Sequence, residues 1–333
     1  MADWFLLAMI AMVGLATLFP EAGRTGGTLH ADQLSDIGIF AIFFLYGVNL
    51  SLENLRAGFF RWRLHLVIQS FTFVIFPLLF LPFRAVFGHM MPPDLLLGFF
   101  YICALPSTIS SSVAMTAMAR GNVPGAIFNA TLSSLLGIFI TPTLVSLMAQ
   151  TQGQAAMSVR DTIAKVALLL LLPFVLGQIV RPFAGAWFAR YKKYTAITDK
   201  CVILLLVFSS FSDSVLAGLW TEYGVSTLGV ALGGSVILLA IVLTLTTVVS
   251  RSLGFDVEDE IAAVLCGSKK TLASGMPMAK LIFAGYPGLG MIVLPIMFYH
   301  QIQLFVCSVL ASRYAARPGA EVIALPLAKT SGR

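Results

Sequence analysis

Two adjacent lysines, Lys269 and Lys270, stand inside an apolar stretch that is long enough to cross a membrane. The segment around them, 266–278, also contains two glycines and a proline. A lysine at bilayer depth costs at least ~2.5 kcal/mol, and non-helical backbone survives there only when it is buried in protein or lines a watery cavity. The pattern therefore predicts a broken helix beside a binding site.

Lys270 and Ser274 are four residues apart, which places them on one face of a helix with Thr271 beside them. Lys269 is expected to point elsewhere, toward a headgroup interface. Acidic residues within 256–260 suit the first turn of a helix, and that start places Lys270 about 15 Å along it, near half the depth of the bilayer. If the span began later, both lysines would lie among headgroups, and the acidic residues argue against that alternative.

A second polar cluster follows Pro106 in another apolar run. Proline removes a backbone donor and clashes with the preceding turn, which frees carbonyl groups. Single serines and threonines in such helices usually bond back to their own turn, but a cluster beside a proline favours a role in binding a substrate or a cation. The candidate residues are Ser107, Thr108, Ser110, Ser111 and Ser112.

Further polar side chains lie at membrane depth, and four of them are candidates to line the same site. Asn129 and Ser133 lie four residues apart, and an interhelical hydrogen bond explains them equally well. For His300 a packing role is more common than a role as a proton relay. These candidates are Gln69, Asn129, Ser133 and His300. Acidic residues are absent from the depth of the spans, so a cation site built on a buried carboxylate is not evident.

The sequence contains no nucleotide-binding loop, no Ser/His/Asp set and no cysteine spacing typical of metal sites. We therefore expect neither an enzyme nor an ATP-driven pump, and no cofactor apart from a sodium ion in one alternative below. The net charge of +6 is attributed to loops facing anionic lipid rather than to nucleic acid.

The chain has 333 residues, of which 58% are hydrophobic and 11% are charged. Soluble domains carry about 25% charged residues, so the composition predicts an all-α, polytopic integral membrane protein. Ten apolar runs reach spanning length. They fall at about 3–20, 35–52, 64–87, 94–118, 123–148, 161–181, 200–220, 225–250, 259–284 and 288–314.

Lysine and arginine are distributed unevenly between the two sides of this arrangement. Only Arg24, Arg84, Arg160 and Lys165 fall on one side, and most of the others fall on the side of the two termini. By the positive-inside rule both termini are cytoplasmic, and we expect the inner membrane of a bacterium. Residues 315–333 would form a cytoplasmic tail.

Ten spans divide into two five-helix repeats, 1–153 and 154–314, and the odd number makes the second repeat inverted. An offset of about 163 residues lays the ninth span on the fourth. The pairs are Cys103 and Cys266, Thr108 and Thr271, Ser111 and Ser274, Met115 and Met278, Pro124 and Pro287, and Gly125 and Gly288. Inverted repeats with interrupted helices at matching positions are typical of secondary transporters.

These motifs resemble the bile acid:sodium symporter superfamily and, within it, the SBF-like branch. The resemblance rests on Ala119-Arg-Gly-Asn122, Ile140-Thr-Pro142, the serines after Pro106 and the segment 270–275, and it covers nearly the whole chain. It implies a panel domain (helices 1, 2, 6 and 7) and a core domain (helices 3–5 and 8–10) in which unwound helices 4 and 9 cross. Substrates of the family are organic anions such as sterol conjugates, bound between the domains, with sodium behind the crossing.

The chain departs from that family at the sodium ligands. A glutamate of the ninth span falls on Lys270 or Ala273, and hydroxyl ligands of the fifth span fall on Ala126 and Ala130. The resemblance therefore implies the fold but not a two-sodium mechanism. A weak sodium site would be left at Ser111, Ser112 and Gln69.

The leading hypothesis is a secondary transporter of a small organic anion in which the Lys270 ammonium replaces sodium. The ammonium would donate to carbonyls and hydroxyls at the crossing, with Thr108, Ser111 and Ser112 as candidates. Proton release from the lysine would then couple to transport. In one alternative Lys270 or Lys269 binds the substrate carboxylate or sulfate directly, with sodium coupling lost or residual. A cation/proton antiporter is disfavoured by the missing carboxylate, and a non-transporting sensor or scaffold is disfavoured by the broken-helix repeat.

Overall fold

The computed structural model describes residues 4–49, 59–151, 159–190, 192–218 and 226–317. This part of the chain is all helical and contains no strand. The predicted repeat boundary at 153 and residues 318–333 of the predicted tail lie outside it. The helices of the first half are α1 (Trp4–Leu18), α2 (Pro20–Gly23), α3 (Ala31–Asn49), α5 (Trp62–Ser70), η1 (Phe71–Ile75), α6 (Phe76–Phe87), η2 (Gly88–Met90), α7 (Pro93–Ala104), α8 (Ser110–Met118) and α9 (Val123–Thr151). Those of the second half are α10 (Val159–Val166), η3 (Ala167–Leu171), α11 (Leu172–Arg190), α12 (Lys192–Leu216), α14 (Ser226–Ser252), α15 (Val257–Gly267), α16 (Leu272–Ile282) and α17 (Leu289–Ala315).

Five continuous helices in the described residues are long and apolar enough to cross a membrane. A helix of 27 residues, such as α14 or α17, is about 40 Å long and exceeds the hydrocarbon thickness of a bilayer. The five spans are Trp62–Met90, Val123–Met148, Arg160–Gly185, Ser226–Ser252 and Leu289–Ala315. The protein is therefore an integral membrane protein, as its composition predicts.

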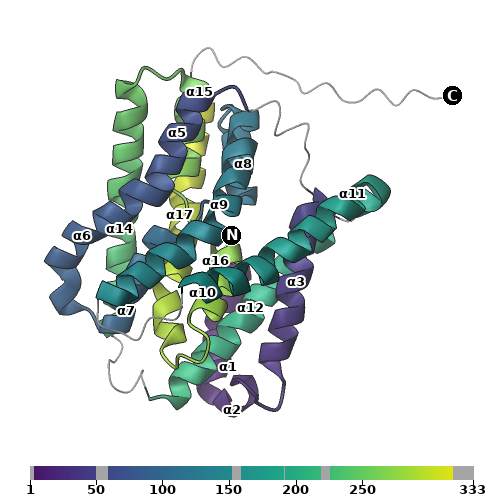
Figure 1. Cartoon of the computed structure of the whole chain (residues 1–333). Helices are drawn as coiled ribbons and strands as arrows, with labels where there is room; N and C mark the ends of the chain where they lie inside the picture. Colours follow the sequence, from purple (N-terminus) through teal and green to yellow (C-terminus); the bar gives the residue numbers. More distant parts are fainter. Residues whose placement is uncertain (1–3, 50–58, 152–158, 191, 219–225, 318–333) are drawn as a thin grey trace.

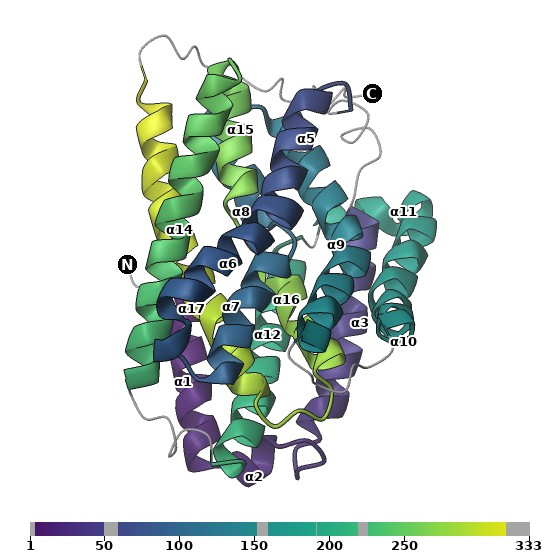
Figure 2. The same cartoon turned by 60° about the vertical axis from the view of Figure 1, so that its left-hand side comes forward.

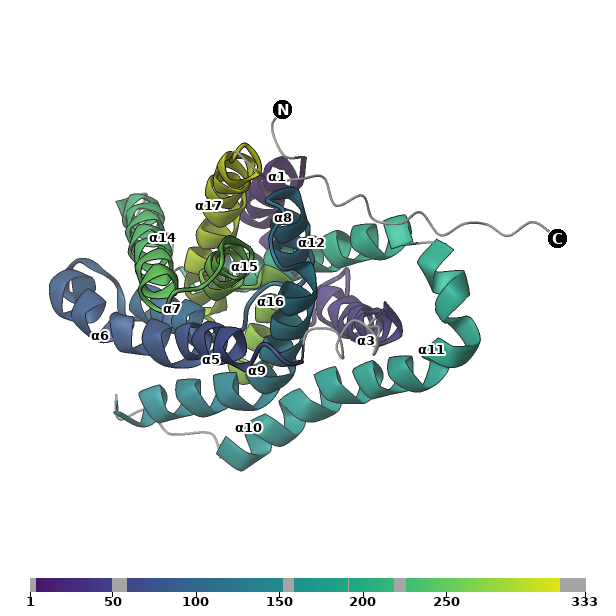
Figure 3. The ribbon, with the colours of Figure 1, turned by 90° about the horizontal axis from the view of Figure 1, so that it is seen from above.

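The helices pack in two groups that Figures 1 and 2 show from different sides. In one group, α12 packs against α1 and α3, and α11 runs along α3. In the other, α15 lies against α5, α8, α9 and α14, while α17 packs on α7 and α14. Seen from above in Figure 3, α10 continues into α11 along the outer side of α9 and α3.

Two of the predicted spans are interrupted at their centres. The first break, residues 105–109, separates α7 from α8, and the second break, residues 268–271, separates α15 from α16. Pro106 lies in the first break, where its missing N–H does not cost a helical hydrogen bond. Thr271 closes the second break as the N-cap of α16, because its hydroxyl accepts from the N–H of Ser274. Both predicted interruptions are present.

A wider π-type turn, η1, joins α5 to α6. There the N–H of Phe76 donates to the carbonyl of Phe71, five residues back. In the same π register, the N–H of residue 77 would donate to the carbonyl of Thr72, but residue 77 is Pro77, which has no N–H. The Thr72 carbonyl is thereby left available to a side chain from elsewhere.

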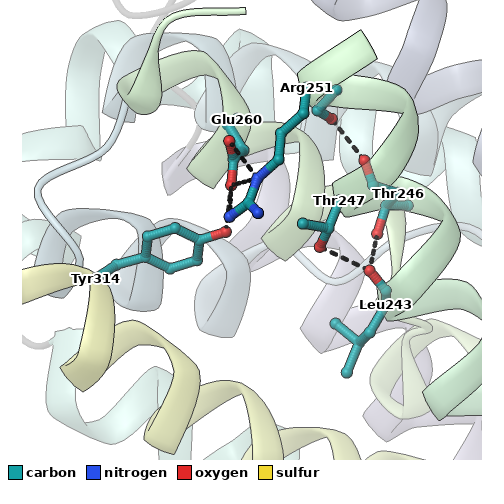
Figure 4. A network of polar contacts seen from close by, with 7 residues as sticks. Leu243, Thr246, Thr247, Arg251, Glu260 and Tyr314 are labelled. Carbon is teal, nitrogen blue, oxygen red and sulfur yellow. Dashed lines mark hydrogen bonds and ion pairs between the residues drawn. The ribbon is translucent and has the colours of Figure 1, made fainter.

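The acidic start of α15 is held by ion pairs to neighbouring helices. Arg251 of α14 donates from Nε and Nη2 to Glu260, at 3.0–3.1 Å, and the Tyr314 hydroxyl of α17 donates to the same carboxylate at 2.7 Å. Figure 4 shows the side chains of Glu260, Arg251 and Tyr314 meeting at this point. The contacts join α14, α15 and α17 at one end of the molecule.

Two further carboxylates of this segment reach other elements. Asp259 accepts from Arg61 at 2.9 Å and from Asn122 at 2.6 Å, and Glu258 pairs with Arg317 at 3.3 Å. Together with Glu260, these carboxylates form what we call the α15 anchor. The anchor fixes the start of the helix that ends in the second break.

Candidate functional site at the two helix breaks

The two breaks lie against each other in the interior. The N–H of Thr271 donates to the carbonyl of Pro106 at 3.1 Å, and the hydroxyl of Ser107 donates to the carbonyl of Cys266 at 2.6 Å. These residues are far apart in the sequence, and all four are buried. The contacts satisfy polar backbone groups that a helix break would otherwise leave unpaired in an apolar interior.

The contacts across the crossing are reciprocal. Ser107 bonds to the Cys266 carbonyl, while the ammonium of Lys270 bonds to the Cys103 carbonyl at 3.0 Å. Lys270 follows Ser107 by 163 residues, and Cys266 follows Cys103 by the same number. Positions that are 163 residues apart therefore make corresponding contacts in opposite directions.

The backbone N–H groups of Ser107 and Lys270 also have corresponding partners, because each donates to a side-chain oxygen. The N–H of Ser107 donates to the Ser133 hydroxyl of α9 at 2.9 Å, which gives this predicted site residue a role in holding the break. The N–H of Lys270 donates to Oε1 of Gln303 in α17 at 2.8 Å. In each half, the long helix that follows the break supplies the acceptor.

Lys270 is fully buried, and its ammonium group is surrounded by main-chain oxygens. Nζ donates to the carbonyls of Thr72, Cys103 and Leu105 at 2.8, 3.0 and 2.6 Å, and it lies 4.1 Å from the centroid of the Phe76 ring. An ammonium group has three N–H donors, so all three are used. The carbonyls come from the π turn and from the C-terminal end of α7, which carries partial negative charge.

Carbonyl acceptors for Lys270 are therefore confirmed, but the hydroxyl partners predicted beside them are wrong. Thr108, Ser111 and Ser112 bond to one another instead: Thr108 shares hydrogen bonds with the hydroxyls of Ser111 at 2.8 Å and of Ser112 at 2.7 Å. Carbonyls take their place because a helix end leaves up to four carbonyls without intrahelical donors, whereas hydroxyls can satisfy one another.

Lys269 does not point to a headgroup interface, so that prediction is also wrong. Its side chain is fully buried and donates to the carbonyl of Ser111 at 3.0 Å and to the Met115 sulfur at 2.8 Å. The prediction assumed helical spacing between the two lysines, but residues 268–271 are not helical. Both ammonium groups thus lie at the crossing.

The remaining predicted residues of the breaks occupy different positions. Ser112 donates to the Leu265 carbonyl at 3.1 Å, so it also joins the two broken helices. Ser110 is exposed in the first turn of α8. Thr271 and Ser274 are buried and form the cap of α16, but they do not share a helical face with Lys270, because that residue precedes the helix.

Gln69 and Asn129 form a polar contact between α5 and α9. Gln69 Nε2 donates to the main-chain and side-chain oxygens of Asn129 at 3.1 and 3.2 Å, and Asn129 Nδ2 donates to Nδ1 of His65 at 2.9 Å. Sequence reasoning missed His65, although its four-residue spacing from Gln69 was a usable signal. Oε1 of Gln69 is buried and accepts no hydrogen bond.

The amide of Gln303 holds the main chain of Lys270 from both sides. Besides accepting from its N–H, Gln303 donates through Nε2 to the Lys270 carbonyl at 2.7 Å and to Nδ1 of His300 at 3.0 Å. The hydroxyl of Tyr299 donates to the carbonyl of Ser268 at 2.7 Å. Of these α17 residues only His300 was predicted as a site residue, because a glutamine or tyrosine in an apolar helix does not by itself indicate which backbone group it will reach.

Comparison with known proteins gives matches along nearly the whole chain. The model of the SBF-like CPA transporter family matches residues 3–316. An uncharacterized protein, PA2026, of Pseudomonas aeruginosa is 48% identical over 316 residues, covering 95% of this chain and 93% of the relative. The putative symporter YfeH of Escherichia coli is 44% identical over 312 residues, 94% and 92% of the two chains. Sodium/bile acid cotransporter 7 of Xenopus tropicalis is 31% identical over 315 residues, 92% and 90% of the two chains.

Proposed function

Because the chain belongs to the SBF-like CPA transporter family, we propose that it carries a small organic anion across the membrane with Lys270 in the place of a bound cation. Membership makes the protein a transporter rather than an enzyme. The names of two relatives, a putative symporter and a sodium/bile acid cotransporter, support a carboxylate or sulfate of bile-acid-like type as the substrate. The proposed mechanism is alternating access.

The architecture we propose for this mechanism has ten spans in two inverted repeats, 1–153 and 154–314. The reciprocal contacts at an offset of 163 residues support the repeat. The panel domain would consist of α1, α3, α10–α11 and α12, and the core domain of α5–α9 and α14–α17, in line with the two packing groups. The excess of lysine and arginine on one side supports cytoplasmic termini in a bacterial inner membrane.

The observation that carries the proposal is the set of ligands around the Lys270 ammonium. Three carbonyl oxygens at 2.6–3.0 Å and an aromatic face are groups that would equally well bind a metal cation. With all three N–H donors in use inside the protein, the ammonium has none left for a substrate anion. Direct binding of the substrate by Lys270 is therefore the weaker alternative.

The negative group of the substrate has a better place at the helix starts of the crossing. Helices α8 and α16 both begin at the breaks, and N-terminal ends of broken helices carry partial positive charge that favours anions. Ser110 is exposed in the first turn of α8 and provides a hydroxyl donor, whereas the start of α16 is buried. The two buried ammonium groups add positive charge to the same crossing.

A sodium-coupled symporter is the second candidate, and one observation favours it. The unpaired, buried Oε1 of Gln69 is an acceptor that a cation would satisfy. Ser111 and Ser112, which complete the predicted weak sodium site, lie in α8 and bond to Thr108 of the first break. Gln69 lies in α5 and bonds to Asn129 instead. A cation/proton antiporter is a further alternative, supported only by the buried, ionisable lysines.

The proposal is tested with purified protein in two steps. A thermal-shift screen against organic anions, with and without sodium, identifies a ligand, and flux of that ligand into proteoliposomes follows. We expect uptake without sodium, and loss of uptake in Lys270→Met, while Lys165→Met, an exposed lysine of α10, transports normally. Strict dependence of uptake on sodium at fixed pH would overturn the replacement of sodium by Lys270 and favour the second candidate.

A further inference from the structure

Gln303 is the residue that fixes the main chain of Lys270. Its side chain is fully buried, and its amide bonds to both the N–H and the carbonyl of that one residue, at 2.8 and 2.7 Å. A helix break has no helical hydrogen bonds to set its conformation, so side-chain contacts must do so. This pair of hydrogen bonds, which we call the Gln303 clamp, determines where the Lys270 side chain starts.

The clamp also sets the hydrogen-bonding role of His300. Only Oε1 can accept from the N–H of Lys270, so the NH2 group of Gln303 is the one that faces Nδ1 of His300, at 3.0 Å. An amide NH2 group can only donate, so Nδ1 acts as the acceptor in this contact. The orientation of one amide thus couples the second break to a histidine that is partly exposed.

We propose that Gln303 is a positioning residue for Lys270 and that His300 makes this positioning sensitive to pH. A proton on Nδ1 of His300 removes its acceptor and creates a donor that faces the Gln303 NH2 group. Nδ1 also lies 3.5 Å from the Lys270 carbonyl, so a protonated ring competes with Gln303 for that acceptor. Acidification therefore loosens the clamp and frees the second break. The consequence for transport rests on the proposed function, but the loosening itself does not.

Among the described residues, charged groups stand on the helices packed against α17 and in the second break itself. Those on the elements packed against α17 mostly have partners of their own: Asp94 with Tyr286, Asp213 with Thr25, Arg251 with Glu260, Lys280 with Asp36, Asp259 with Arg61 and Glu258 with Arg317. Lys200 of α12 lies over the Phe5 ring. The break itself contributes Lys269 and Lys270. A positive charge on His300 would therefore join two ammonium groups of the same crossing, which adds repulsion to the loss of the clamp.

Hydrogen–deuterium exchange of the peptide that covers 268–275 tests the inference without any substrate. Rates are measured at about pH 5 and about pH 8, on the two sides of the range in which histidines titrate, and are corrected for the intrinsic effect of pH. In the native protein we expect exchange to be about tenfold faster at the acidic pH, the change expected from losing one or two net hydrogen bonds. His300→Gln offers an amide oxygen to Gln303 and cannot gain a proton, so its exchange should stay slow at both values.

Two further variants keep the test decisive. Gln303→Met should exchange fast at both pH values, and His89→Gln, an exposed histidine in η2, should keep the native step. A native protein without the step, or a His300→Gln variant that retains it, would overturn the inference even if Gln303→Met fails to fold. Because the readout needs neither sodium nor a substrate, its failure is distinct from failure of the proposed function.

Discussion

The crossing of the broken helices and the α15 anchor hold charge in opposite ways, although one helix connects them. In the anchor, carboxylates such as Glu260 meet arginine and tyrosine side chains. At the crossing, Lys270 meets only main-chain carbonyls and an aromatic ring. An ion pair is neutral as a unit, and if one member is replaced the other is left as an uncompensated charge. Neutral carbonyls can hold either an ammonium group or a metal cation, so the cation can differ while the carbonyls around it stay the same.

This difference assigns different tasks to the two ends of α15. The anchor joins that helix to α5, α14 and α17, and to the turn before α9, and so sets its position. The crossing then presents charge that can be gained, lost or replaced. Changes in the crossing should alter which ions the protein responds to, while changes in the anchor should alter stability alone.

The largest effect is expected from Lys270→Met. The variant leaves three buried carbonyls without their donor, and although it also removes the cost of burying a charge, we expect a net loss of about 3 kcal/mol in the free energy of unfolding. Sodium should restore part of this stability, because the same carbonyls can bind a metal cation. Thermal unfolding in detergent, with sodium compared against choline, measures both effects.

Native protein provides the control, since its ammonium already occupies the carbonyls and sodium should not stabilise it further there. Lys165→Met controls for the loss of a positive charge from the chain. If sodium stabilised the native protein and Lys270→Met equally, the carbonyls around Lys270 would not be a cation site. The crossing would then not differ from the α15 anchor in its response to ions.

Glu260→Gln should have the next largest effect, about 2 kcal/mol of stability, because it removes the charge from a bidentate pair. Arg251 is largely exposed whereas Glu260 is 9% exposed, so the cost comes mainly from the buried carboxylate side. We expect lower thermal stability and no new response to sodium. A sodium response in this variant would show that the anchor and the crossing are not separable.

Much of this arrangement follows from the sequence, because helix breakers and misplaced charges stand out against an apolar background. The two breaks, the pairing of Cys103 with Cys266 and the burial of Lys270 were all predicted in that way. Carbonyl acceptors for Lys270 were predicted as well, but not which carbonyls, since side-chain patterns do not indicate which main-chain groups come together in the fold. The Thr72 carbonyl illustrates this: it is available only because a π turn places Pro77 one residue out of the usual register.

Lys269→Met should destabilise the protein less than Lys270→Met, by about 1 kcal/mol. Its ammonium donates to one carbonyl and to the weak acceptor sulfur of Met115, so fewer strong acceptors lose their donor. We also expect no stabilisation by sodium, because one carbonyl and a thioether are a poor set of ligands for a hard cation. The comparison of Lys269→Met with Lys270→Met by thermal unfolding in sodium therefore tests whether the carbonyl set, rather than any buried lysine, defines the cation site.

Arg61→Gln should have the smallest effect, about 0.5 kcal/mol, because Arg61 is 56% exposed and surface ion pairs are weak and screened by salt. The carboxylate of Asp259, aided by Asp256, raises the pKa of Arg61 above its ordinary value. A raised pKa stabilises the folded state at every pH below the titration of arginine and is lost only as the pH rises through that range. The Arg61 contribution is thus constant from about pH 5 to about pH 8. The expected result is an equal loss of stability at both values that shrinks as salt is added. A pH-dependent difference between Arg61→Gln and the native protein would instead place a titrating group in the anchor, and histidine-linked acid sensitivity would then no longer belong to the crossing alone.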